Sequence, residues 1–175
     1  MKINILTLIL LALLAACNTT PKNDKAPDAA GAKDETTVPS DRAMVDNPLG
    51  AIWEYGFNPD TEAYEIVQLR AVDKDTLTGE ALEKIINHNW PKVQIRFAGT
   101  SNDTALVSIP DSEALARQMG SAGAENFMVS TTYSFTCMEG VNHVKFEFTE
   151  GDHAVPGVYH RNSWEVTVKQ VDEQI

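Results

Sequence analysis

The hydrophobic and polar positions of the chain change their periodicity several times, and each change marks a predicted element. Three segments alternate apolar and polar residues with a period of two, as half-buried strands do. A fourth segment, which precedes them in the chain, is rich in β-branched and aromatic residues and is also predicted to be a strand. In chain order the four predicted strands are residues 63–72, 92–97, 104–109 and 143–149. Turn residues at 100–103 separate the second and third, which are therefore predicted to form a hairpin. Residues 164–171 near the end of the chain alternate in the same way.

Two helices are predicted among these strands. Thr78 suits the N-cap of a helix that Pro91 ends, and a second helix is predicted over 124–138, where apolar residues recur at spacings of four and three. Gly140 suits the left-handed position after that helix. The order from residue 78 to 149 is thus helix, strand, strand, helix, strand. Because each element has one apolar side, we expect an α+β fold: a small mixed or antiparallel sheet with both helices on one face, plus flanking strands.

The first seventeen residues predict a processed leader. Lys2 precedes a short apolar run over residues 5–14, which is shorter than a membrane-spanning helix requires. The segment Leu14-Ala15-Ala16-Cys17 resembles the lipobox of bacterial lipoproteins, in which the cysteine is acylated and becomes the new N-terminus. We therefore expect a signal peptide over residues 1–16 and a lipid on Cys17. An ordinary signal peptide and an uncleaved N-terminal helix are the alternatives.

Composition separates a tether from a folded domain. Residues 17–48 are rich in Asn, Thr, Lys, Asp, Ala and Pro, which predicts a flexible tether after the lipidated cysteine. Residues 49–175 are predicted to form a single α+β domain. Attachment through acyl chains indicates the bacterial cell envelope. Asn18 stands where some Gram-negative lipoproteins carry an Asp that resembles an inner-membrane retention signal, so the outer membrane is preferred.

Charge and cysteine content narrow the possible partners. The 175 residues carry a formal net charge of −11, and no local basic segment is apparent, so nucleic acid is not expected as a partner. No segment after the leader approaches the roughly 20 apolar residues of a spanning helix, so membrane contact is expected through the lipid anchor alone. Cys137 lies among apolar residues and is predicted to be buried.

Motifs for catalysis or metal binding are not found. No serine lies in Gly-x-Ser-x-Gly, and the spacing of His143, His153 and His160 matches no zinc motif, so these histidines are predicted to be solvated. A site of Asp152, His153 and His160 is conceivable if their loop folds back. We expect no catalytic residue, no metal and no cofactor.

Two other groups of residues could form a binding surface. The polar side of the predicted sheet is a candidate interaction face, composed of Lys92, Gln94, Arg96, His143, Lys145 and Glu147. Aromatic residues could line a ligand groove or close the core; they are Trp53, Tyr55, Phe57, Tyr64, Trp90, Tyr159 and Trp164.

Several segments resemble a GerMN-type domain, a module named from spore germination and sporulation proteins and found in other bacterial envelope lipoproteins. The segments are residues 67–72, 79–86, 105–109, 120–122 and 138–146. Met138-Glu139 departs from the Phe-Pro or Leu-Pro usual in that family, and Asn89-Trp90-Pro91 replaces the expected Gly-Pro. The resemblance implies a fold similar to ring-building motifs, which mediate protein contacts in envelope complexes. It brings no catalytic residue.

These observations predict an envelope-tethered lipoprotein domain that acts as a protein-binding or scaffolding module without an enzymatic step. Its partner would be another envelope protein. The alternative is a lipoprotein that binds a small ligand, a glycan or a peptide, in an aromatic-lined cleft. A hydrolase or metal-dependent enzyme ranks third.

Overall fold

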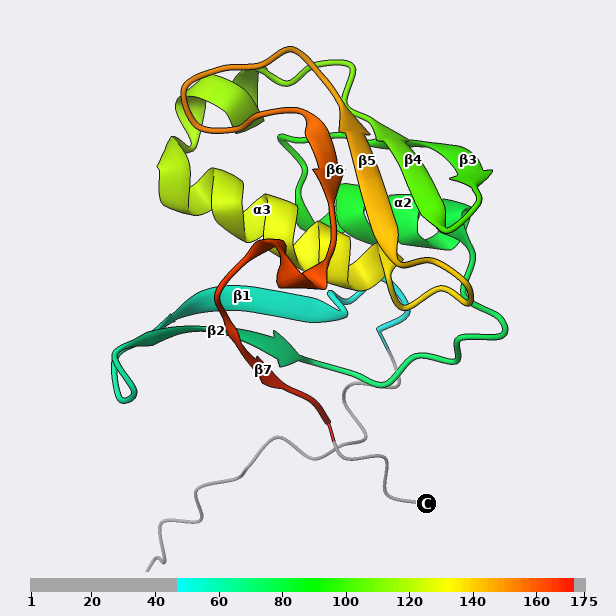
Figure 1. Cartoon of the computed structure of the whole chain (residues 1–175), viewed down its shortest axis with the longest axis horizontal. Coiled ribbons are helices and arrows are strands. Elements are labelled where there is room, and N and C mark those ends of the chain that lie inside the picture. The colour runs from blue at the N-terminus through cyan, green and yellow to red at the C-terminus, as the bar shows by residue number, and fades with distance from the viewer. Residues whose placement is uncertain (1–46, 172–175) are drawn as a thin grey trace, which may run out of the picture. The chain divides into compact units, whose positions relative to one another are not determined.

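Residues 47–171 are described by a computed structural model, in which the long helix α3 contacts two separate β-sheets (Figure 1). The strands are β1 (Trp53–Asn58), β2 (Ala63–Gln68), β3 (Arg96–Ser101), β4 (Thr104–Ser108), β5 (His143–Glu147), β6 (Gly157–Tyr159) and β7 (Thr167–Lys169). The helices are α2 (Gly79–Asn89) and α3 (Gly120–Phe135), with a short π-helical segment η1 (Ala114–Gln118) and a 3-10 turn η2 (Arg161–Ser163). The predicted signal peptide, Cys17 and the tether up to residue 46 lie outside the described residues.

The larger sheet has the strand order β3-β4-β5-β6. Its two outer pairs are antiparallel, whereas the central pair β4 and β5 is parallel. Both α2 and α3 lie on the same side of this sheet (Figure 1). The strands turn their apolar residues to that side, and Ala105, Val107, Val144 and Phe146 are buried there. The α+β class and the order helix, strand, strand, helix, strand are thus confirmed.

The smaller sheet has the order β1-β2-β7. Strands β1 and β2 form an antiparallel hairpin, and β7, from the far end of the chain, pairs with β2 in parallel. The buried residues of this sheet include Trp53 and Tyr55 on β1 and Ile66 on β2. The backbone N–H of Tyr55 donates to the Ser130 hydroxyl of α3 at 3.2 Å, which joins the hairpin to the helix. The alternating segment 164–171 therefore yields one short strand of the smaller sheet.

Helix α3 differs from the expected amphipathic helix over 124–138. It begins and ends earlier, and every residue from Phe127 to Phe135 is buried. Both sheets pack against α3, so a polar face of this helix would not be exposed to solvent. Ser134 fits into this environment because its hydroxyl donates to the Ser130 carbonyl at 2.7 Å. Past the helix, Gly140 has the left-handed conformation that its residue type predicts (φ 72°).

The predicted strand over 92–97 is wrong in its first part, because β3 begins only at Arg96. Val93 and Ile95 are buried, but they belong to the connection after α2. The Asn87 side chain satisfies the Ile95 backbone, accepting from its N–H at 2.7 Å and donating to its carbonyl at 3.1 Å. The alternating pattern here therefore reflects burial of a loop held by a side chain, because the pairing of β3 with β4 starts only at Arg96.

Candidate functional site

The face of the larger sheet opposite α2 and α3 is covered by no other described element (Figure 1). Strand register places Arg96 beside Ser108, and Ser108 beside Glu147, in one row across β3, β4 and β5. A second row runs from Leu106 through Lys145 to Val158 at the edge strand β6. We call these six residues, together with His143 at the start of β5, the open face.

Charges on the open face are partly neutralised. Lys145 Nζ lies 2.6 Å from Glu147 Oε1, so these two side chains form an ion pair. Arg96 is exposed, and no carboxylate of the described residues lies within 4.0 Å of its guanidinium. The face carries both signs of charge, and Val158, with 55% exposure, adds an apolar side chain at its edge.

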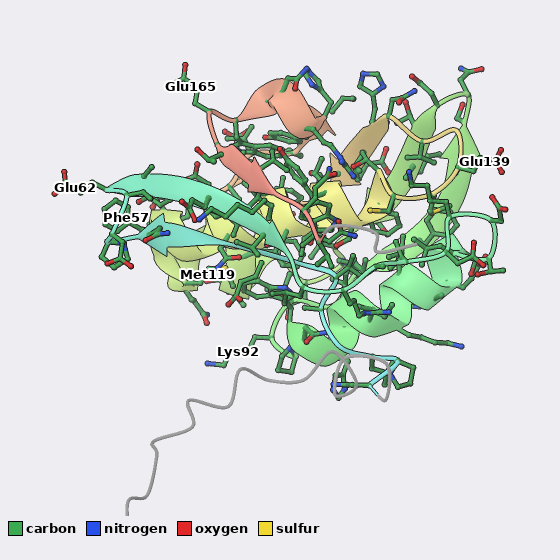
Figure 2. All side chains as sticks on the ribbon, turned by 90° about the horizontal axis from the view of Figure 1, so that it is seen from below. Phe57, Glu62, Lys92, Met119, Glu139 and Glu165 are labelled. Carbon is green, nitrogen blue, oxygen red and sulfur yellow. The ribbon has the colours of Figure 1, made fainter. Side chains whose placement is uncertain are left out.

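Two residues of the predicted interaction face, Lys92 and Gln94, lie elsewhere. Both precede β3, and Figure 2 shows Lys92 beyond one end of α2. Gln94 Nε2 donates to the carbonyls of Asn87, Trp90 and Pro91 at 3.1–3.3 Å, so its amide closes the end of α2. Lys92 and Gln94 are not part of the open face because β3 begins only at Arg96. Arg96, His143, Lys145 and Glu147 do share the open face, as predicted.

A polar cleft of about 460 Å³ opens next to the open face at His143. It is lined by Thr136, Val141, Asn142, His143, His160, Arg161 and Asn162. The rings of His143 and His160 have centroids 5.6 Å apart and are nearly perpendicular. His153 lies elsewhere, with Nδ1 3.2 Å from the Ser121 hydroxyl. Within residues 47–171 no three His, Cys, Asp or Glu side chains come close enough to hold a metal ion.

Each cleft histidine is oriented by a neighbour. His143 Nδ1 lies 3.0 Å from Asp103 Oδ2, so Nδ1 carries a proton and Nε2 is left for the cleft. Desolvation raises the pKa of Asp103, but the hydrogen bond and charge of His143, together with hydrogen bonds from Asn142 and Thr104, outweigh it, so the pKa lies below its ordinary value. His160 Nδ1 accepts from the backbone N–H of Asn162 at 3.2 Å, which places the proton of the neutral ring on Nε2.

Arg161 lines the cleft and is partly buried. Its Nε donates to the Thr136 hydroxyl at 2.8 Å and its Nη2 to the Tyr133 carbonyl at 3.3 Å, at the end of α3. Its guanidinium carbon lies 4.9 Å from the Tyr133 ring centroid and 5.3 Å from that of Trp53. Cys137 is buried, as predicted, and its sulfur lies 3.5 Å from Nη2. No carboxylate of residues 47–171 lies within 4.0 Å of this partly buried cation.

The candidate aromatic residues all pack against other aromatic rings. Trp53 and Tyr55 are buried, and Tyr159 stacks on Trp164 at 5.4 Å. Tyr64 stacks on Tyr55 at 5.3 Å and also contacts Phe57. Phe57 and Tyr64 are nevertheless 55% and 43% exposed, and Figure 2 shows Phe57 at the outer tip of the β1–β2 hairpin. The polar cleft contains none of these rings, so the alternative of an aromatic-lined groove does not apply to this cleft.

Sequence reasoning missed Asp103 and Arg161. Asp103 lies in a turn between β3 and β4, where turn chemistry alone explains an Asp. Arg161 follows His160 directly, but no periodic pattern marks it, and its partners on α3 are 25 and 28 residues away. Both residues acquire their roles only when β5, α3 and η2 come together.

Comparisons with protein families, curated proteins and solved structures find no match to this chain. The resemblance to GerMN-type domains stays a prediction from the quoted segments. No helix in the described part of the chain is long and apolar enough to span a bilayer.

Proposed function

We propose that this protein is a lipid-anchored module of the bacterial cell envelope that binds another envelope protein through the open face. One observation carries the proposal. Helices α2 and α3 cover one face of the four-stranded sheet, and the described residues leave its other face uncovered. The predicted lipid on Cys17 and the tether up to residue 48 would hold this surface near the membrane.

The composition of the open face suits a protein contact. Its central strands β4 and β5 are paired on both sides, so their side chains project from a rigid support. Leu106 and Val158 flank Lys145 in one row, and Arg96 and Glu147 end the other. Apolar side chains among charges of both signs are typical of non-obligate interfaces, in which charges select the partner. A GerMN-like role in protein assembly is part of the same proposal.

Charge reversal on the face tests the contact. A photocrosslinking residue at position 158, in cells that produce the full chain, is expected to capture one defined envelope protein. The double variant Arg96→Glu, Lys145→Glu should lose that adduct, because two cations of the face become anions. Lys92→Glu is the matched control, since Lys92 is exposed but lies outside the face. Equal crosslinking by the wild type, the double variant and the Lys92→Glu control would contradict the proposal.

The anchor is tested separately. Labelled palmitate should be incorporated into the wild-type chain, and Cys17→Ser should abolish both incorporation and membrane fractionation. Crosslinking that is lost in Cys17→Ser and restored by a foreign lipoprotein leader would indicate that the anchor serves to place the open face. Labelling that persists in Cys17→Ser would exclude Cys17 as the acylated residue.

A further inference from the structure

We propose that the polar cleft between His143 and Arg161 binds the phosphate group of a small, soluble phosphate monoester. This proposal does not rest on the protein contact proposed above, and the two surfaces share His143. Its volume of about 460 Å³ is within the usual range for small-molecule sites.

Charge is the first argument. The chain has a formal net charge of −11, yet none of the seven residues that line the cleft is acidic. Arg161 contributes a cation that no carboxylate of residues 47–171 contacts, although partly buried charges are ordinarily paired. An anion in the cleft would supply the missing counter-charge. The donors gathered here reduce the repulsion that an anion otherwise meets on so acidic a protein.

The occupied edge of Arg161 favours phosphate over a carboxylate. A carboxylate is usually bound by two parallel N–H groups of one guanidinium edge. Here Nε already donates to Thr136, while Nη2 donates to the Tyr133 carbonyl and lies 3.5 Å from the Cys137 sulfur. Neither edge of the guanidinium therefore keeps two free N–H groups, and Nη1 is left for a ligand. A tetrahedral oxyanion, whose oxygens point in several directions, is better suited to single donors that come from separate elements.

The histidines and amides supply those donors. Nε2 of His160 carries the proton of its neutral ring, and among the described residues it has no hydrogen-bond partner. Nε2 of His143 is likewise unpartnered; it can accept from a phosphate hydroxyl or, when the ring is protonated beside Asp103, donate to a phosphate oxygen. Asn142 and Asn162 also line the cleft and add amide N–H groups.

Conservative variants are chosen so that the structural hydrogen bonds stay and the ligand contacts are removed. In His143→Asn, the amide can still donate to Asp103 but nothing replaces Nε2. In His160→Asn, the side-chain oxygen can still accept from the backbone N–H of residue 162. His153→Asn is the matched control, because His153 lies outside the cleft and bonds to Ser121. Thermal melts of the three variants check that each is folded.

Titration calorimetry on the full-length chain, in a phosphate-free detergent, tests the proposal with inorganic phosphate, glycerol phosphate and acetate. Phosphate and glycerol phosphate should bind with one site per chain, and acetate should bind much more weakly. His143→Asn and His160→Asn should each weaken phosphate binding about tenfold, the effect of one lost charge-assisted hydrogen bond. His153→Asn should bind as the wild type does.

Three results would overturn the proposal. Phosphate that binds no better than acetate would remove the preference for a tetrahedral anion. Unchanged affinity in both cleft variants would place any bound phosphate elsewhere. Binding to vesicles that contain phosphatidic acid, without binding to either soluble probe, would assign the cleft to a lipid headgroup and exclude a soluble ligand. The open-face variant Arg96→Glu, Lys145→Glu separates the two proposals, since its loss of crosslinking does not require a loss of phosphate binding.

Discussion

At the scale of single residues, Glu65 is the most strongly perturbed carboxylate described. It is only 5% exposed, although it lies on the outer side of the smaller sheet. Asn58 and Thr61 donate to its two oxygens at 2.9 Å, and Lys169 Nζ lies 2.6 Å away. Hydrogen bonds from Asn58 and Lys169 are the main causes that lower its pKa from 4.5 to about 2. Glu65 thereby ties β7 to the β1–β2 hairpin.

This shift predicts an acid-sensitive contribution to stability. The lowered pKa means that the folded state favours ionised Glu65, so its contribution is complete above the unfolded pKa of about 4.5 and is lost as the pH falls toward 2. Melting temperatures of the wild type and Glu65→Gln should therefore differ at pH 7 and approach each other as the pH falls from 4.5 toward 2. Glu54→Gln, an exposed carboxylate on β1, should show no such difference. A gap between wild type and Glu65→Gln that does not change with pH would contradict the assignment.

Substitution of Thr132 on α3 is predicted to stabilise the fold, whereas substitution of Glu65 is predicted to destabilise it. Its side chain is fully buried and its hydroxyl has no hydrogen-bond partner among the described residues. A buried unpaired hydroxyl costs stability, so Thr132→Val should raise the free energy of unfolding by about 1 kcal/mol, measured by denaturant titration. Thr132→Ser keeps the hydroxyl and should give no gain. Destabilisation by the valine would show that the hydroxyl has a partner after all.

At the scale of elements, local signals predicted those parts that local chemistry determines. Thr78 caps α2 through the Ala81 N–H at 3.2 Å, and β4 and β5 occupy the segments that their alternation indicates. The start of β3 was misplaced because Asn87 reaches across to satisfy Ile95, a contact between residues of different segments. Helix α3 was predicted with one apolar stripe because the sequence alone does not reveal a second sheet on its other side.

The start of α2 is sensitive to side-chain size. A Cβ added to Gly79 would overlap the ring of Phe97, which stacks on Phe135 at 5.8 Å. Gly79→Ala should therefore lower the free energy of unfolding by about 1–3 kcal/mol, because overpacking exceeds the gain in helix propensity of at most about 1 kcal/mol. Gly56→Ala in β1 is the control, since a Cβ there meets nothing within 4 Å. A stabilised Gly79→Ala, measured in urea, would show that Phe97 moves aside freely.

At the scale of the whole described unit, the two sheets are joined by segments far apart in the sequence. The chain passes from β6 in the larger sheet through η2 to β7 in the smaller one, with Arg161 at the start of η2. Periodicity predicts a strand near the C-terminus but not its partner, because the parallel pairing with β2 joins segments that lie far apart in the sequence. For the same reason His143 could be predicted as a surface residue, while its neighbours Asp103 and His160 could not.

Arg161 is expected to connect these parts energetically. It bonds to the end of α3 and packs on Trp53 of the smaller sheet, so Arg161→Met should lower the free energy of unfolding by about 2–3 kcal/mol. Arg161→Lys should recover only part of this loss, because it keeps the charge but not the Nε bond to Thr136. Arg117→Met is the control, because Arg117 forms an exposed pair with Glu113 at 3.6 Å and its loss should cost less than about 1 kcal/mol. Hydrogen exchange in Arg161→Met should accelerate in both β6 and β7, since both lose the same support. Faster exchange in one of them alone, or a loss no larger than that of Arg117→Met, would mean that the two sheets are held together by apolar packing on α3 without help from this side chain.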